Sequence, residues 1–243
     1  MTPRLVRVRL GGDALAGFGP ADPAASVRLL LPEAGARGAL VVPRWTGNEF
    51  LLPDGRRPTL RTLTLRRFDA DALELVVEIV VHGSGAAARW ASEAEPGDRV
   101  ALSGPAAGFR PAADAAHYVL AGDETALPAV STLLEVIPAD KAVTVVIELA
   151  RPDGEAPLPV RPGWVVHWPV VSPGAAPGDA VVAALRRVPL DPGTWVWVAG
   201  EAAAMQRVRR LLFGERGLPR ARGTVRGYWK HGRAASADPA DLG

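Results

Sequence analysis

The 243-residue sequence predicts two domains in series, an antiparallel β domain followed by an α/β domain with a parallel sheet. Up to about residue 110, apolar and polar residues alternate with period two, and Gly, Pro and Asp interrupt the pattern at short intervals. Beyond that point, apolar strands alternate with amphipathic helical segments, as in βαβ units. The Pro/Ala-rich segment 110–116 is the expected boundary. We therefore expect domains at 1–112 and 113–232 and a disordered tail at 233–243.

The first domain is expected to consist of short strands. A hairpin link at Asp69–Ala72 joins two of them, and the turn signature Pro96-Gly97-Asp98 precedes the last, which is expected to end at Gly104-Pro105. The expected strands are Arg4–Leu10, Ser26–Leu31, Arg61–Phe68, Leu73–His82 and Arg99–Ser103. Strands at this spacing predict an antiparallel barrel or sandwich.

The second domain is expected to alternate strands and helices without an internal repeat. The expected strands are Tyr118–Ala121, Ala142–Leu149, Trp164–Trp168, Thr194–Ala199 and Gly223–Gly227. The expected helices are Thr125–Ile137, Asp179–Arg187 and Glu201–Phe213. This order favours a parallel sheet with helical crossovers.

The composition excludes several classes of protein. The chain has no cysteine, so disulfide scaffolds and thiol catalysis are excluded. Lys+Arg of 28 against Asp+Glu of 26 leaves a net charge of +2, which does not indicate a nucleic-acid partner. No apolar run approaches the roughly 18 to 20 residues that cross a bilayer, and the amino terminus does not resemble a signal peptide. We therefore predict a cytoplasmic protein with no membrane partner.

The usual catalytic motifs are missing from the sequence. The four histidines share no metal-binding spacing, so no metal site is predicted. Neither a G-x-S-x-G elbow nor a P-loop occurs, so no motif in the sequence supports hydrolase or nucleotide-hydrolysing chemistry.

A small-residue segment, Gly83-Ser84-Gly85-Ala86-Ala87-Ala88, follows the expected strand 73–82 and opens a short helix. It formally fits G-x-G-x-x-A, although its surroundings are antiparallel and the helix is short for a dinucleotide crossover. Small residues at a helix amino terminus let a phosphate approach unpaired N–H groups. A glycine-rich connection without a ligand is the alternative interpretation.

The segment Arg61-Thr62-Leu63-Thr64-Leu65-Arg66 carries two arginines on an expected strand. Strand alternation places Arg61 and Arg66 on opposite faces unless the strand is bulged. A solvated edge strand explains the segment without any ligand. A functional interpretation needs a partner for both arginines.

Two expected parallel strands end in glycine and acid, at Gly122-Asp123-Glu124-Thr125 and at Gly200-Glu201. The carboxyl ends of such strands hold the ligands of open α/β sheets, so the two ends are expected to frame one cleft. Ordinary helix capping explains Asp123, Thr125 and Glu201 equally well. Glu148 ends another strand, where an acid would read a ribose.

The segment Gly227-Tyr228-Trp229-Lys230-His231-Gly232 follows the last strand. It is expected either to anchor the terminus or to form a lid over a flat cofactor. The region around it is rich in arginine, which we interpret as the solvated face of the last helix rather than a nucleic-acid surface. These arginines are Arg207, Arg209, Arg210, Arg216, Arg220, Arg222, Arg226 and Arg233.

Taken in order, the segments resemble the siderophore-interacting protein family, the FAD-dependent ferric-siderophore reductases, from about residue 4 to residue 233. The resemblance rests on five sequence signatures, which are RTLTLRRFD, VVHGSGAAARWASEAEPGDRVALSGP, LAGDETALPAV, WVWVAGEAAAMQRVRRLLFGERGLP and GYWKHGR. The resemblance implies a ferredoxin-reductase-like plan, with an FAD-binding β-barrel at 1–112 and an NAD(P)H-binding α/β domain at 113–232.

The resemblance also implies roles for the matching positions. Arg61 would lie against the phosphates or ribityl chain of FAD, and Thr64 would position the isoalloxazine edge. The implied FAD contacts are Arg61, Leu63, Thr64, Leu65 and Arg66 in the first signature, and His82, Gly83, Gly85, Ala87, Ala88 and Trp90 around the pyrophosphate. The implied nicotinamide-nucleotide contacts are Gly122, Asp123, Glu124, Thr125, Ala126, Gly200 and Glu201. Tyr228, Trp229 and Lys230 would close over the flavin or contact the dinucleotide or substrate.

Two positions depart from the family pattern. Leu63 stands where a tyrosine usually stacks on the flavin, which removes about 0.5 to 1.5 kcal/mol of aromatic stacking. Ala86-Ala87-Ala88 replaces the usual Pro-Ala-Ser, which removes a hydroxyl worth about 1.5 to 3 kcal/mol beside a phosphate.

The implied activity is hydride transfer from NADH or NADPH to FAD, followed by electron transfer to the Fe(III) of a siderophore and release of Fe(II). The expected partner is a ferric siderophore, and the expected state is a monomer or weak dimer. The same scaffold repurposed for another flavin-dependent or flavin-free biosynthetic reaction is one alternative, and a non-catalytic siderophore-binding module is another. The sequence leaves open the choice between NADH and NADPH, the identity of the siderophore and the effect of Leu63 and Ala88 on FAD binding.

Overall fold

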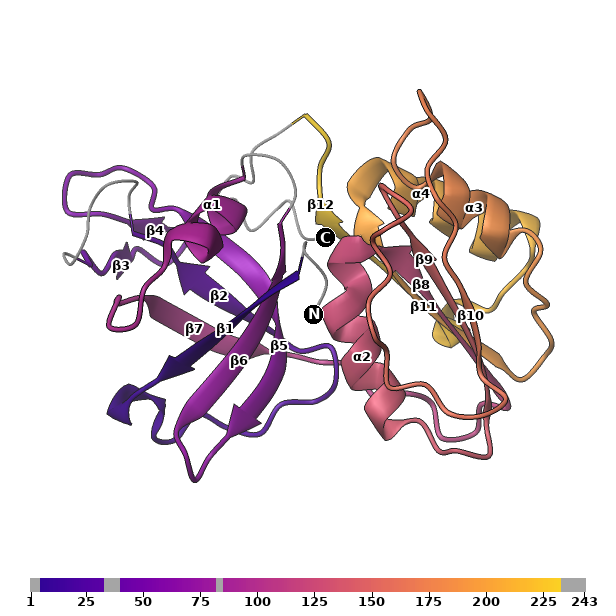
Figure 1. The fold of residues 1–243 in the computed structure, drawn as a ribbon, viewed down its shortest axis with the longest axis horizontal. Helices are drawn as coiled ribbons and strands as arrows, with labels where there is room; N and C mark the ends of the chain where they lie inside the picture. The colour runs from indigo at the N-terminus through magenta and orange to yellow at the C-terminus, as the bar shows by residue number, and fades with distance from the viewer. Residues whose placement is uncertain (1–4, 33–39, 82–84, 233–243) are drawn as a thin grey trace. The chain divides into compact units, whose positions relative to one another are not determined.

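The computed structural model describes residues 5–32, 40–81 and 85–232, which form two compact units, one within 5–109 and one within 110–232 (Figure 1). The expected tail at 233–243 and the predicted site residues His82 and Gly83 lie outside the described residues.

The amino-terminal unit is a five-stranded antiparallel sheet with the strand order β1-β6-β5-β2-β7 (Figure 1). Its strands are β1 (Leu5–Gly11), β2 (Ser26–Leu30), β5 (Leu60–Asp69), β6 (Glu74–Val80) and β7 (Ala101–Ala106). The alternating apolar residues that predict these strands also form the core, because the side chains of Val27, Leu65, Leu75 and Val77 belong to one apolar cluster. The predicted strands are all present, and none of their ends is shifted by more than three residues.

Strand β7 differs from its prediction, because it continues through Gly104-Pro105 to Ala106 instead of ending there. Proline cannot donate a hydrogen bond to a sheet ladder and is tolerated on edge strands. Strand β7 is such an edge, with β2 as its paired neighbour. The Gly-Pro signal therefore marks an edge strand in this case.

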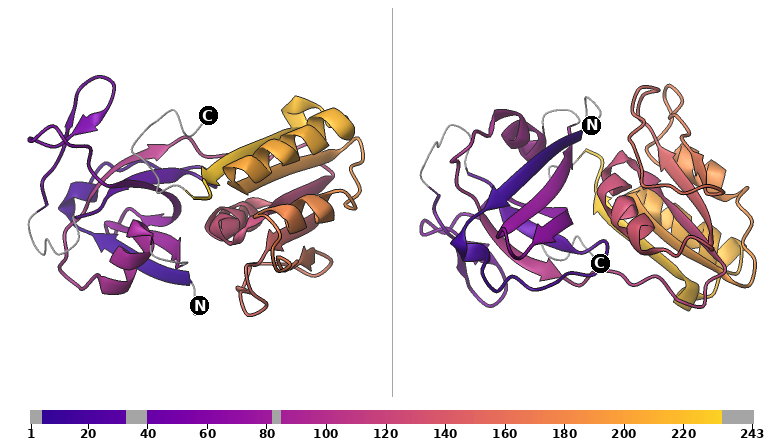
Figure 2. Two further views of the ribbon diagram at one scale, coloured as in Figure 1. Left: turned by 90° about the horizontal axis from the view of Figure 1, so that it is seen from above. Right: turned by 60° about the horizontal axis from the view of Figure 1, so that its bottom comes forward.

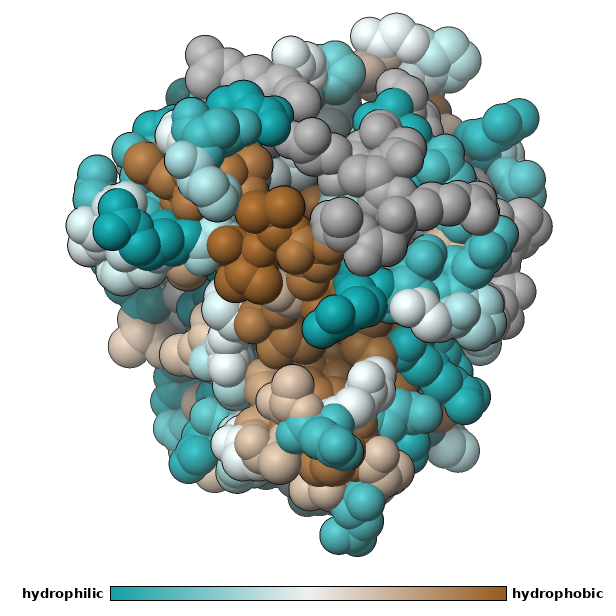
Figure 3. All heavy atoms as spheres, turned by 90° about the vertical axis from the view of Figure 1, so that its left-hand side faces the viewer, coloured by the Kyte–Doolittle hydropathy of each residue, from teal (hydrophilic) through white to brown (hydrophobic). Residues whose placement is uncertain are grey.

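The unit also holds short elements, of which only the helix was expected. They are the turn η1 (Asp13–Leu15), the hairpin strands β3 (Arg44–Trp45) and β4 (Phe50–Leu51), and the helix α1 (Ala86–Glu93). The hairpin was not predicted, because two-residue strands give no periodic signal. Apolar side chains gather on the face shown in Figure 3, and Val41, Val42 and Trp45 are the large apolar residues most exposed in this unit.

The carboxy-terminal unit is a five-stranded parallel sheet with the strand order β10-β9-β8-β11-β12 (Figures 1 and 2). Its strands are β8 (His117–Asp123), β9 (Ala142–Glu148), β10 (Val165–His167), β11 (Thr194–Glu201) and β12 (Gly223–Trp229). The chain builds outward from β8 to β10 and then returns to the other side of β8. The strand order therefore reverses between β8 and β11, the point at which sheets of this kind bind nucleotides.

Helices cover both faces of the parallel sheet (Figure 2). They are η2 (Glu124–Ala126), α2 (Leu127–Val136), α3 (Asp179–Leu185), α4 (Ala202–Arg209), η3 (Arg210–Glu215) and η4 (Arg220–Arg222). Helices α3 and α4 pack on the face that carries Val119, Val196 and Val198. Right-handed crossovers place α2 on the opposite face. Each predicted helix is present, although the predicted helix 201–213 leaves α-helical geometry at Arg210.

Several arginines of the last third of the chain are bound to the protein itself, which corrects the expectation that most of them are solvated. Arg209 donates to the Val225 carbonyl oxygen, Arg216 to the Leu185 and Val188 carbonyl oxygens, and Arg222 to both Asp114 oxygens. These bonds tie the last helix and the turn that follows it to β12, to the end of α3 and to the segment before β8.

The half-buried imidazole of His117 is expected to make the stability of the carboxy-terminal unit depend on pH. Its Nε2 atom lies 2.9 Å from the Thr144 hydroxyl, and burial lowers the pKa of the imidazole from its ordinary value. The unfolded chain therefore binds this proton at a higher pH than the folded protein does, so stability falls as the pH drops below about 6.5. Urea unfolding between pH 5 and 8 is expected to show this loss. The His117→Gln variant is expected to lose less stability over the same range, and an equal loss in both proteins would contradict the assignment.

Candidate functional site: the start of helix α1 and the switch point of the parallel sheet

The N-cap residue of helix α1 has no side chain to accept a hydrogen bond from the first turn. The N-cap position is Gly85, and the first turn consists of Ala86, Ala87 and Ala88, none of them acidic. A Cβ atom at Gly85 would meet no heavy atom within 4 Å, so the approach to this helix start is open in the described part of the chain. The first N–H groups of a helix have no intrahelical acceptor and favour an anion. The phosphate contact predicted for Gly85, Ala87 and Ala88 stays a prediction.

Arg61 lies at the same end of the antiparallel sheet. Arg61 is the second residue of β5, and its antiparallel neighbour β6 ends at Val80, a few residues before α1. The guanidinium is half-buried, its Nη1 atom donates to the Leu60 carbonyl oxygen at 2.7 Å, and burial lowers its pKa. The planar guanidinium group is suited to a bidentate contact with a phosphate.

The neighbouring residues of the first signature face inward. Leu63 packs against the apolar core cluster, while Thr64 and Leu65 are 8% and 6% exposed. The Leu65 N–H donates to the Ala25 carbonyl oxygen. Flavin contacts by these three residues stay predictions.

Arg66 points to the face opposite Leu75 and Val77, since its Nε atom lies 3.7 Å from an oxygen of Glu78. Glu78 is 6% exposed and also accepts two hydrogen bonds from Arg7, at 3.0 and 2.5 Å. Arg61 and Arg66 therefore lie on opposite faces, as alternation predicts; the bulge in β5 falls between Leu65 and Arg67. This ion-pair cluster offers Arg66 a structural role beside the predicted FAD contact.

Trp90 of α1 has a buried indole nitrogen with no hydrogen-bond partner among the described residues. Ala88, in the same helix, is 5% exposed. A buried donor without an acceptor is costly in a protein interior. The role of Trp90 in FAD binding stays a prediction.

The switch point of the parallel sheet brings the two predicted glycine-acid segments together. Gly122 pairs with Ala199, and a Cβ atom at Gly122 would lie 2.1 Å from the Ala199 carbonyl oxygen and 2.6 Å from the Ala126 Cβ. A Cβ atom at Gly200 would lie 2.6 Å from an oxygen of Asp123. Both glycines are therefore required by close approach between β8 and β11.

The acids at these strand ends bind the chain's own N–H groups. Asp123 accepts from the Thr125 N–H and hydroxyl, the Glu201 N–H and the Trp229 indole, and Glu201 accepts from the Ala204 N–H at 2.8 Å. Burial raises the pKa of Asp123. The capping interpretation of Asp123, Thr125 and Glu201 thus describes the geometry. Glu124 is 8% exposed and Ala126 fully buried.

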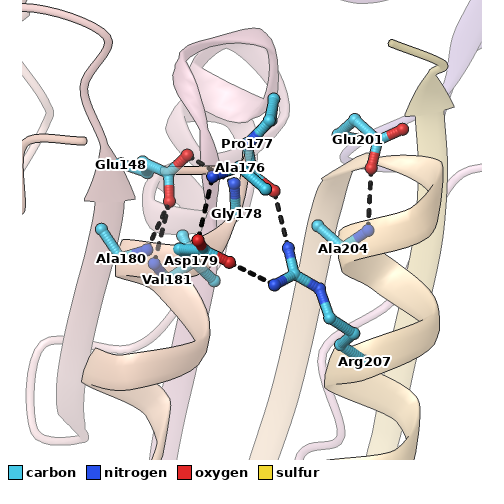
Figure 4. A network of polar contacts seen from close by, with 10 residues as sticks. All are labelled: Glu148, Ala176, Pro177, Gly178, Asp179, Ala180, Val181, Glu201, Ala204 and Arg207. Atoms are coloured by element: carbon cyan, nitrogen blue, oxygen red, sulfur yellow. Dashed lines mark hydrogen bonds and ion pairs between the residues drawn. The ribbon is translucent and has the colours of Figure 1, made fainter. Parts of the chain in front are cut away.

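Glu148 caps α3 (Figure 4). Its oxygens accept from the N–H groups of Gly178 at 2.6 Å, Ala180 at 2.9 Å and Val181 at 3.0 Å. Burial raises the pKa of this carboxyl too. Because both oxygens are engaged and the residue is 3% exposed, Glu148 is not placed to read a ribose. Arg207 bonds to Asp179 and to the Pro177 carbonyl oxygen, which links α4 to the start of α3 (Figure 4).

The end of β12 is bulged, since Gly227 pairs with Gly200 and Trp229 with Glu201, which leaves Tyr228 as the extra residue. The Tyr228 ring lies 6.2 Å from the Trp197 ring, and Lys230 is exposed. Among the described residues, no group of three or more His, Asp or Glu is arranged to hold a metal ion, and none of the helices is long and apolar enough to span a bilayer.

Comparison with known proteins decides the family. A family model described as siderophore-interacting protein matches residues 115–232, and one described as siderophore-interacting FAD-binding domain matches residues 1–109. A protein of Mycobacterium tuberculosis without an assigned activity is 35% identical over 247 residues, covering 96% of this chain and 87% of the relative. The chain belongs to the siderophore-interacting protein family. Within this family, a solved siderophore utilization protein from T. fusca has a TM-score of 0.84 at 39% identity, covering 97% of this chain and 91% of that one.

Other members and neighbours extend the comparison. Ferric vibriobactin reductase of Vibrio cholerae is 28% identical over 98% of this chain and 88% of its own length, and NADPH-dependent ferric-chelate reductase of Escherichia coli is 29% identical over 92% and 86%. Phthalate dioxygenase reductase shares the fold alone, with a TM-score of 0.60 at 16% identity over 97% of this chain and 66% of that one. These findings confirm the resemblance, the ferredoxin-reductase-like fold class and, at the level of the family, FAD and NADH or NADPH as cofactors.

Proposed function

We propose that this siderophore-interacting protein is an FAD-dependent NAD(P)H oxidoreductase that reduces the Fe(III) of a siderophore and releases Fe(II). The observation that carries the proposal is the open, acid-free start of α1 at the same end of the antiparallel sheet as the half-buried Arg61. The names of the Vibrio cholerae and Escherichia coli relatives support a ferric chelate as the substrate.

The residues of the amino-terminal unit would hold the flavin by its diphosphate. The N–H groups of Ala86, Ala87 and Ala88 would donate to one phosphate, and Arg61 would neutralise charge on the diphosphate or contact the ribityl chain. Backbone groups beside Thr64 would orient the ring. This mode of diphosphate binding uses main-chain donors and one guanidinium, so it does not need the serine that Ala88 replaces.

The bound flavin supplies two-electron uptake from a nicotinamide and one-electron delivery to iron. The chain itself orients the partners and needs no acid or base for the hydride step. Gly122 and Gly200 allow β8 and β11 to meet closely at the proposed nucleotide site, while Lys230 offers an exposed cation to a neutral or anionic chelate. Oxygen chelators hold Fe(II) more weakly than Fe(III), so reduction releases the metal.

The direct test is spectroscopic. The purified protein is titrated with FAD, and the loaded protein is then mixed anaerobically with NADH or NADPH. We expect flavin absorbance to bleach and to recover when a ferric siderophore is added, with Fe(II) captured by a chromogenic chelator. Protein that retains no flavin once excess FAD is removed, or flavin that is bleached but does not recover, would overturn the proposal. A colourless protein would favour the flavin-free alternative.

The phosphate-accepting role of α1 predicts opposite effects of one substitution on stability and on binding. An acid in the first turn stabilises a helix, so Ala87→Asp is expected to leave thermal stability unchanged or slightly raised. The same charge repels the diphosphate, so FAD affinity is expected to fall about tenfold or more. The matched Ala87→Asn variant, which has nearly the same shape and no charge, is the control. Equal FAD affinity of the two variants, measured by fluorescence titration, would contradict the prediction.

A further inference from the structure

The carboxylate of Asp123 accepts four hydrogen bonds from three different elements. Its Oδ1 atom accepts from the Thr125 N–H at 2.9 Å and the Thr125 hydroxyl at 2.5 Å. Its Oδ2 atom accepts from the Glu201 N–H at 2.9 Å and the Trp229 indole N–H at 2.8 Å. Two oxygens offer about four lone-pair sites in all. The carboxylate is therefore saturated by the chain itself and has no acceptor position left for a nucleotide.

The bond to Trp229 spans the switch point. Trp229 ends β12, which pairs with β11, whereas Asp123 ends β8 on the other side of β11. The bulge at Tyr228 changes the register of the last rung, and bulges commonly re-aim a side chain beside a functional site. The indole of Trp229 thus reaches back across the end of β11.

A second bond holds the same segment. The His231 N–H donates to Glu201 Oε1 at 3.2 Å, and the Trp229 and His231 rings lie 6.3 Å apart. The segment Trp229–His231 is therefore tied down at both ends by acids of the switch point. This is the edge at which open α/β sheets receive a nucleotide.

We propose that Asp123 is a positioning residue, which fixes Trp229 at the carboxyl edge of β8 and β11 so that its ring forms part of the nicotinamide-nucleotide site. The inference rests on the proposed function. It assigns Asp123 a task different from the direct cofactor contact that the resemblance implies, because its oxygens are bound by Thr125, Glu201 and Trp229.

The choice of variants follows from the hydrogen bonds. Asp123→Asn keeps the size of the side chain but replaces one acceptor oxygen with a donor, so two of the four N–H and O–H donors lose their acceptor. Trp229→Phe keeps an aromatic ring and removes only the indole N–H. Tyr118→Phe is the matched control, because it removes one hydrogen bond, from the Tyr118 hydroxyl to the Ala112 carbonyl oxygen at 2.7 Å, at the other end of β8.

Two measurements separate positioning from general stability. Binding of NADP⁺ and NAD⁺ to each protein is measured by calorimetry, a readout that needs no turnover. Anaerobic stopped-flow then measures flavin reduction by NADPH or NADH and, separately, flavin oxidation by a ferric siderophore. For Asp123→Asn we expect about tenfold weaker nucleotide binding, with siderophore-driven oxidation within about twofold of the wild type. We expect wild-type behaviour from Tyr118→Phe.

The double variant tests whether Asp123 acts through Trp229. If it does, Trp229→Phe weakens nucleotide binding in the wild type and adds little in the Asp123→Asn background. Fully additive effects, or equal nucleotide affinity in Asp123→Asn and Tyr118→Phe, would overturn the inference while wild-type activity stands. A wild type that neither binds nor oxidises either nucleotide would overturn the proposed function and this inference together. If Asp123→Asn does not fold, wild-type nucleotide affinity in Trp229→Phe alone is sufficient to overturn the inference.

Discussion

We expect the Arg61→Ala variant to bind FAD about 10- to 100-fold more weakly than the wild type. A hydrogen bond to a charged group contributes about 1.5 to 3 kcal/mol, and the half-buried position of Arg61 limits screening by solvent. The loss should appear in a fluorescence titration of the flavin-free protein with FAD. Added salt should weaken FAD binding more in the wild type than in the variant, because only the wild type has the charged contact.

The control for Arg61 lies on the same strand. Arg67 also belongs to β5, its side chain is 60% exposed, and its ion pairs with Asp69 and Glu74 are long, at 3.6 Å. Arg67→Ala removes the same charge from the protein as a whole, so it should leave FAD affinity within about twofold of the wild type. Equal loss in the two variants would mean that net charge, rather than a contact by Arg61, governs binding.

The second large effect is on folding. Gly122→Ala is expected to destabilise the carboxy-terminal unit by about 3 kcal/mol or more, because the new Cβ atom would lie 2.1 Å from the Ala199 carbonyl oxygen. Relief requires β8 and β11, two central strands, to separate. Urea unfolding followed by tryptophan fluorescence measures the loss, since Trp195 and Trp197 are buried in this unit.

Gly214 supplies the matched glycine for this experiment. It lies in the same unit, within Arg210–Glu215, and a Cβ atom there would meet nothing within 4 Å. Gly214→Ala should leave stability unchanged or raise it by up to about 1 kcal/mol, as expected for glycine in a helical segment. A Gly122→Ala protein as stable as Gly214→Ala would contradict the close approach of the two strands.

The elements that periodicity predicts are those with a buried apolar face. Strands such as Ala142–Glu148 and Thr194–Glu201 were predicted to within two residues, because nearly every side chain in them is buried. The hairpin Arg44–Trp45 and Phe50–Leu51 was missed, because its side chains are exposed or only half-buried and its strands are too short to show a period. Burial leaves a sequence pattern, whereas a short exposed hairpin does not.

The candidate site was predictable to the extent that it is local. Glycine followed by acid after an apolar strand indicated Gly122 and Gly200, and the parallel topology brings them together. The partners of Asp123 were not predictable in the same way, since Trp229 is 106 positions away and reaches Asp123 only through a bulge. The same holds for Glu78 with Arg7, which are 71 positions apart. Such pairs are fixed by tertiary register, for which a single sequence carries no signal.

The start of α1 differs from the starts of α3 and α4 already in the protein without cofactors. In the parallel-sheet unit, Glu148 and Glu201 already occupy the amino ends of α3 and α4, whereas the glycine at the start of α1 supplies no side chain for this purpose. The first amides of α1 should therefore exchange rapidly with solvent deuterium in the flavin-free protein and slow down once FAD is added, while those of α4 keep the same exchange rate throughout. The helices α3 and α4 of the carboxy-terminal unit thus have acceptors within the chain, whereas the start of α1 in the amino-terminal unit is expected to receive its acceptor from FAD.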